Sequence, residues 1–145
     1  MIVKLFTSIF LFLLAFTNLN AQNYGRLASY TVDSVIDTLF AKADSFKSYI
    51  EFDKAETLYS NILDIYSDSA VVYYGRLARA DNYLLNKKRN AAFYELQKLD
   101  NNSLSENVLF SIDKQLLWAT YYYQLGQYDT AYVLFNDIEQ QIKEV

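Results

Sequence analysis

The sequence predicts an all-α protein in which antiparallel helix pairs stack as a short α-solenoid of about three helix-turn-helix repeats. Apolar and aromatic residues recur every three or four positions, which is the period of an amphipathic helix, and no segment alternates as a strand does. Within the stretch 116–138, Gly126 separates two such stripes, as expected for two helices folded back on one another. Two fainter copies of this unit lie upstream.

The internal repeat is anchored on alanines. An alanine lies within each predicted second helix, at Ala55, Ala92 and Ala131, with successive anchors 37 and 39 residues apart. Another alanine stands twelve residues before each anchor. Small residues on both helices of a pair let the axes approach closely, and bulky residues fill the space beside the crossing. The predicted structural positions are Ala43, Phe46, Ala55, Tyr59, Ala80, Tyr83, Ala92, Leu96, Ala119, Tyr122, Gly126, Ala131 and Phe135.

The expected helices can be justified in chain order from their stripes and caps. The strongest pattern runs from Val32 to Ile50, with apolar residues stepping by three or four. Ser67-Asp68-Ser69 should end the second helix and cap the third, and Ser103 with Glu106 forms a capping box for the fifth. Gly126 should end that fifth helix, because glycine adopts the left-handed C-cap conformation without steric cost. The predicted helices are about 32–50, 53–66, 70–85, 89–99, 103–125 and 128–145.

The repeated pattern resembles the tetratricopeptide repeat (TPR) over about residues 36–145. The third copy carries the motif most fully, with Trp118, Ala119, Tyr122, Gly126, Tyr128, Ala131 and Phe135. The first copy has Ile50 where the glycine belongs, the second has Lys87 and Arg89 at its turn, and the chain has no proline. The resemblance implies repeats at about 36–69, 70–102 and 103–145. The alternative is an ordinary antiparallel helical bundle in which the alanines coincide.

The same resemblance implies that the first helix of each pair lines a concave face that binds a partner. Such a face mixes apolar and aromatic contacts with four aspartates, and it suits an extended or helical peptide carrying some positive charge. The expected partner-binding residues are Asp37, Phe40, Asp44, Lys47, Tyr74, Leu77, Asp81, Leu84, Asp113, Leu116, Thr120, Tyr123 and Gln124.

The N-terminal segment has the pattern of a secretory signal peptide. Lys4 provides a basic start, Leu5–Phe16 is apolar apart from two residues, and Ala21 is a small residue before the expected cleavage. The apolar run is too short to cross a bilayer, which needs about 20 residues. The protein is therefore expected to be exported, periplasmic or extracellular, with no membrane span after cleavage; an uncleaved anchor is the alternative. The predicted divisions are a signal peptide at 1–21, a lead-in at 22–31 and the repeat domain at 32–145.

Composition narrows the classes of function. The chain has no histidine and no cysteine, which removes the usual zinc ligands, thiol nucleophiles and histidine acid–base chemistry. A formal net charge of −4 argues against nucleic acid, which needs clustered cations. We therefore expect no enzyme, cofactor or metal, and a protein or peptide as the partner. The alternative is a helical-bundle small-molecule binder or enzyme with a buried carboxylate pocket.

Two further stretches carry predictions about contacts. The last helix spreads apolar surface at Val133, Leu134, Ile138 and Ile142, whereas a terminal repeat normally shows a polar outer face. This pattern predicts that the C-terminal helix pair self-associates, docks on a partner, or continues into a larger envelope or sensor assembly. The cations at 87–89 suit the end of a helix, with a docking patch as the alternative.

Overall fold

The computed structural model describes residues 34–101 and 108–143, and within these ranges the chain is helical with no strand. The helix bounds lie close to those expected from the sequence wherever both ends are described. The predicted signal peptide, the lead-in and the capping box at 103–106 lie outside the described residues. The helices are α2 (Ser34–Ser48), α3 (Phe52–Ile65), α4 (Ser69–Leu85), α5 (Arg89–Asp100), α6 (Val108–Gln124) and α7 (Tyr128–Lys143).

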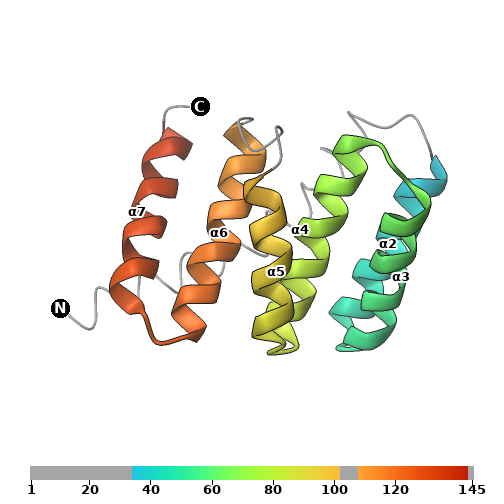
Figure 1. Ribbon diagram of the computed structural model, residues 1–145, viewed down its shortest axis with the longest axis horizontal. Coiled ribbons are helices and arrows are strands. Elements are labelled where there is room, and N and C mark those ends of the chain that lie inside the picture. The colour runs from blue at the N-terminus through green and yellow to red at the C-terminus, as the bar shows by residue number, and fades with distance from the viewer. Residues whose placement is uncertain (1–33, 102–107, 144–145) are drawn as a thin grey trace.

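The helices pack in sequence order as three hairpins (Figure 1). Helix α2 packs against α3, α4 against α5, and α6 against α7, while α3 packs on α4, and both α4 and α5 pack on α6. The stack therefore runs from α2 and α3 at one end to α7 at the other. This arrangement confirms the predicted fold class, an all-α protein of adjacent helices forming a short solenoid.

The turns inside the three hairpins have the same backbone structure. Ile50, Lys87 and Gly126 each adopt a left-handed conformation, with φ of 64°, 57° and 77°. In each turn the next amide donates back to a carbonyl in the last turn of the first helix, which is the Schellman arrangement of a helix C-terminus. These bonds join Glu51 N to Phe46 O (2.9 Å), Lys88 N to Tyr83 O (2.8 Å) and Gln127 N to Tyr122 O (3.0 Å). The repeat thus persists in the backbone where the glycine itself is missing.

The core lies between the helices of each hairpin and between neighbouring hairpins. All six repeat alanines are buried, and the main cluster spans α2 to α5 and continues through Phe110 and Leu117 of α6. A smaller cluster of Ile112, Leu116 and Ile138, with Phe135 packed against it, joins α6 to α7. Helix α7 is consequently held by fewer buried side chains than the helices at the centre of the stack.

Two local features position α4 against α3. Asp68 is the N-cap of α4, and its side chain accepts hydrogen bonds from the amides of Ala70 (2.9 Å) and Val71 (3.2 Å). A Cβ added at Gly75 would lie 2.9 Å from Leu63 Cδ2, so the glycine allows the two helices to approach closely at this point.

Candidate protein-binding surface

The predicted face comes from α2, α4 and α6, but part of it lies in the core. Phe40, Tyr74, Leu77, Leu84 and Leu116 are buried. The Phe40 ring, for example, contacts the Tyr74 ring edge-on at 5.2 Å between centroids. A first helix in the middle of a stack touches its hairpin partner and both neighbouring hairpins, which buries most of its circumference. The other eight predicted residues are at least partly accessible.

The charged part of this face is internally paired. Lys47 Nζ lies 2.7 Å from Asp81 Oδ2 and 3.4 Å from Asp44 Oδ1, and the Tyr59 hydroxyl donates a hydrogen bond to Asp44. Burial alone would lower the pKa of Lys47, but the carboxylates of Asp81 and Asp44 outweigh it and raise the pKa above its usual value. Lys47 therefore pairs with two of the four predicted aspartates and ties α2 to α4, and the three side chains together keep one negative charge.

The third repeat contributes the most open part of the face. Tyr123 is 44 % exposed and is the most exposed residue of the predicted set. Its ring lies edge-on to Tyr128 of α7, with 5.4 Å between centroids. The Gln124 amide donates to Leu84 O at 3.1 Å, which ties α6 to the end of α4. Asp113 and Thr120 are partly buried. Tyr123 is the side chain that a partner would meet first.

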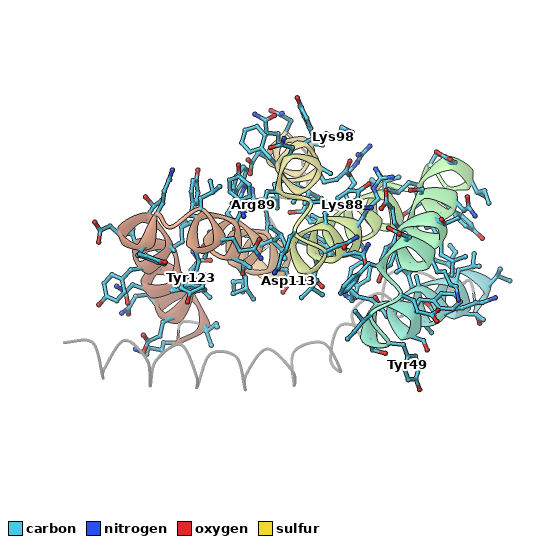
Figure 2. The ribbon with its side chains drawn as sticks, turned by 90° about the horizontal axis from the view of Figure 1, so that it is seen from below. Tyr49, Lys88, Arg89, Lys98, Asp113 and Tyr123 are labelled. Atoms are coloured by element: carbon cyan, nitrogen blue, oxygen red, sulfur yellow. The ribbon has the colours of Figure 1, made fainter. Side chains whose placement is uncertain are left out.

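Cations gather away from this face. Figure 2 shows Asp113 and Tyr123 toward one side of the stack and Lys88, Arg89 and Lys98 toward the other. Two of these cations are paired with carboxylates, Lys88 with Asp53 and Glu56 and Lys98 with Glu95.

Sequence reasoning did not identify the ion cluster around Glu95. This carboxylate is buried in α5 and accepts from Arg79 (2.9 Å), Arg76 (3.0 Å) and Lys98 (3.2 Å), while Arg79 also donates to Ser60 of α3 (3.0 Å). The cluster joins α3, α4 and α5. The two arginines stand three positions apart and so share one face of α4, which was the available sequence signal.

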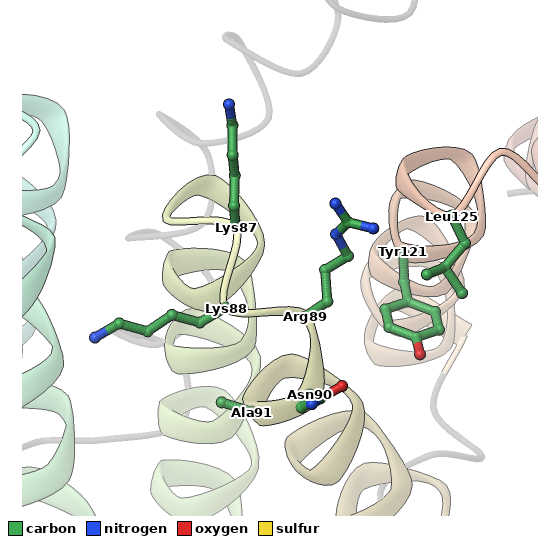
Figure 3. A pocket seen from close by; sticks show the side chains of 7 residues that line it. All are labelled: Lys87, Lys88, Arg89, Asn90, Ala91, Tyr121 and Leu125. Atoms are coloured by element: carbon green, nitrogen blue, oxygen red, sulfur yellow. The ribbon is translucent and has the colours of Figure 1, made fainter.

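An open hollow of about 570 Å³ lies where the α4–α5 turn meets the end of α6 (Figure 3). Arg89 extends toward Tyr121 and Leu125, whereas Lys88 points away from them. The Lys88 amine instead contacts Asp53 (3.0 Å) and Glu56 (2.8 Å) of α3. Hydrogen bonds to these carboxylates raise the pKa of Lys88. One of the three cations predicted as a possible patch therefore serves to join two hairpins.

The described part of the chain shows neither a cluster of metal ligands nor a helix suited to a membrane. Across residues 34–101 and 108–143, no three acidic, histidine or cysteine side chains gather as a metal site would require. Within the same ranges, no helix combines the length and the apolar character needed to span a bilayer.

Comparisons with protein-family models, with curated proteins and with solved structures found no match. What is established is a stack of three helical hairpins whose first helices present one exposed tyrosine and a set of mostly paired charges.

Proposed function

We propose that this protein is an exported TPR-like interaction module that binds a protein or peptide along the face made by α2, α4 and α6. The observation that carries the proposal is that these three helices form one continuous layer. Lys47 joins α2 to Asp81 of α4 at 2.7 Å, and the Tyr73 hydroxyl of α4 donates to Phe110 O of α6 at 3.4 Å. A continuous layer of helices is the kind of extended surface that repeat proteins use for binding.

The ion pairs within the face limit the kind of ligand that the face can bind. Asp44 and Asp81 are already engaged by Lys47, so the strongest new contact available is the exposed Tyr123 ring in α6. The face still carries more acidic than basic side chains. The expected ligand is therefore an extended or helical segment with an apolar or cationic anchor against Tyr123 and a modest positive charge.

Selection of peptides tests this proposal. A random peptide library would be displayed against the immobilised protein, and the affinities of enriched peptides would be measured for the wild type, Tyr123→Ala and Tyr94→Ala. Tyr94 is the matched control because it is 63 % exposed but lies on α5, outside the layer of first helices. Loss of a central aromatic contact should weaken binding about tenfold or more, and the control should bind as the wild type does.

Two results would refute the proposal that peptides bind to the face made by α2, α4 and α6. One is equal affinity of the enriched peptides for the wild type and Tyr123→Ala. The other is that Tyr94→Ala is the variant that loses them. The export part of the proposal has a separate test, which is N-terminal sequencing of the protein recovered outside the cytoplasm. Cleavage after Ala21 would give Gln22 as the first residue.

A further inference from the structure

The second helix of each hairpin has a receiving face that meets the first helix of the next hairpin. In α3 this face meets α4 through polar contacts between side chains far apart in the sequence. They join Asn82 Nδ2 to Phe52 O (3.0 Å), Tyr83 Oη to Glu56 Oε1 (3.1 Å) and Arg79 Nη1 to Ser60 Oγ (3.0 Å). Positions 52, 56 and 60 therefore define the receiving face of α3.

Helix α5 receives α6 through Phe93, at the position of Glu56, and through Asp100, at the position of Leu63. The Phe93 ring lies 5.8 Å from that of Trp118 and 5.7 Å from that of Tyr121, between centroids. Asp100 pairs with Lys114 at 3.0 Å and accepts from Trp118 Nε1 at 3.4 Å. Relative to the repeat alanines, Phe93 occupies the position of Glu56 in α3. The receiving face therefore recurs from one hairpin to the next.

In α7 the receiving face is largely exposed. Its residues at the equivalent positions are Tyr128, Tyr132, Asn136 and Glu139. The two tyrosines are 57 % and 53 % exposed, Glu139 is also exposed, and Asn136 is half-buried. Tyr132 stands where Glu56 and Phe93 stand, and Glu139 where Asp100 stands. Among the described residues, α6 is the helix that packs on α7, and it covers a different side of it.

At the other end of the stack, α2 exposes the surface that would pack against a receiving face. Lys42 of α2 occupies the repeat position of Arg79 and Trp118, and Ser45 occupies that of Asn82 and Tyr121. Both residues are exposed. Helix α2 thus presents outward the positions that α4 and α6 use to dock on the preceding hairpin.

We propose that two copies of this protein associate head to tail, with the receiving face of α7 in one copy packing on α2 of the next. In the register of the α5–α6 contact, where Trp118 meets Phe93 and Asp100, Lys42 of the second copy lies opposite Tyr132 and Glu139. That places a cation against an aromatic ring and a carboxylate. The contact continues the solenoid across two chains and adjoins the proposed peptide groove where the Tyr128 ring contacts that of Tyr123. The α7 face and the α2 face are different surfaces. A pair of copies therefore still has one free α7 face and one free α2 face, and chains longer than dimers form.

The same alignment also brings two carboxylates together between the copies, which is unfavourable. Glu51 occupies the repeat position of Lys88, and Asp129 that of Asp53, which Lys88 contacts at 3.0 Å inside the stack. Between copies, Glu51 therefore lies close to Asp129 and like charges meet. Glu51→Lys should reproduce the internal pairing and tighten association about two- to fivefold, which is the range for an exposed ion pair.

Sedimentation velocity on protein expressed from the full coding sequence tests the proposal. The wild type should show a mass that grows with concentration beyond that of a dimer. Tyr132→Lys, which sets a lysine against Lys42, and Lys42→Glu, which sets a carboxylate against Glu139, should each weaken association about tenfold or more. Val133→Lys is the matched control, because Val133 is 56 % exposed on the same helix but lies off the receiving face, and it should associate as the wild type does.

Mixing the two blocked variants decides the geometry. An equimolar mixture of Tyr132→Lys and Lys42→Glu contains one wild-type contact and one contact in which the two introduced charges are opposite in sign, so it should associate more strongly than either variant alone. A symmetric contact between two α7 helices would leave Lys42→Glu able to associate, and one between two α2 helices would leave Tyr132→Lys able to do so. Either result overturns the head-to-tail proposal, as does a wild type that stays monomeric at the highest concentration measured, or looser association of Glu51→Lys.

Discussion

The turn between α2 and α3 holds an isoleucine in a conformation that L-residues avoid. Ile50 has φ of 64°, and the left-handed conformation costs a residue with a Cβ about 1–2 kcal/mol relative to glycine. Ile50→Gly removes this cost but increases the entropy of the unfolded chain, which opposes folding by about 0.5–1 kcal/mol. Because Ile50 is 75 % exposed, little burial is lost. We therefore expect Ile50→Gly to raise the free energy of unfolding by about 0–1.5 kcal/mol.

Urea and thermal unfolding followed by circular dichroism measure this change. Each kcal/mol should shift Tm by about 2–8 °C for a domain of this size range. Ile50→Ala is the control, because it removes the long side chain but keeps the Cβ that makes the left-handed conformation costly. It should recover little of the gain seen with glycine.

The third turn offers the reciprocal experiment. A Cβ added at Gly126 would meet no atom within 4 Å, so Gly126→Ala tests the backbone conformation without a clash. Its φ of 77° predicts a loss of about 1 kcal/mol. If Gly126→Ala is neutral, or if Ile50→Gly destabilises the protein, the shared left-handed turn is refuted.

Three further predictions concern the core and the ion pairs. Ala43→Leu overfills a helix crossing and should lower the free energy of unfolding by about 1–3 kcal/mol, whereas Ala41→Leu on the exposed side of the same helix should change it little. Glu95→Ala leaves its arginine partners uncompensated and should cost about 2–4 kcal/mol, against less than about 1 kcal/mol for Lys98→Ala, whose side chain is exposed. Both comparisons use urea unfolding, and equal losses within a pair would contradict them. Burial is the main reason that the pKa of Tyr73 is raised above its usual value of 10.0, so above about pH 10 the unfolded chain loses this proton while the folded protein keeps it. Stability should therefore fall with rising pH above that point, and the fall should be shallower in Tyr73→Phe than in the wild type.

The repeat shows how much of the fold can be predicted from the local sequence pattern. The spacing of the alanines and the position of Gly126 come from the sequence, and the three turns later proved to share one backbone conformation. Two of those turns contain Ile50 and Lys87, residues that do not favour a left-handed conformation, so composition alone would not have placed them. The hairpin imposes the turn because packing of the paired helices outweighs the local cost.

The predicted binding face shows where such signals end. The resemblance to the tetratricopeptide repeat implied which residues of α2, α4 and α6 share a side, but a sequence pattern does not show how many other helices cover that side. Leu77 and Leu84 are buried, and Lys47 is paired with Asp81, 34 positions away. The buried Glu95 cluster depends in the same way on α3, α4 and α5 meeting at one place.

By itself, the sequence determined the class of fold, the helix positions and the repeat, because helical period, caps and turn residues act within a few neighbours along the chain. Only the tertiary structure decided which first-helix side chains stay accessible, which charges neutralise one another, and that the receiving face of α7 lies open. Those properties depend on contacts between helices of different hairpins. Such contacts join residues that are far apart in the sequence, so the sequence pattern within one helix does not predict them.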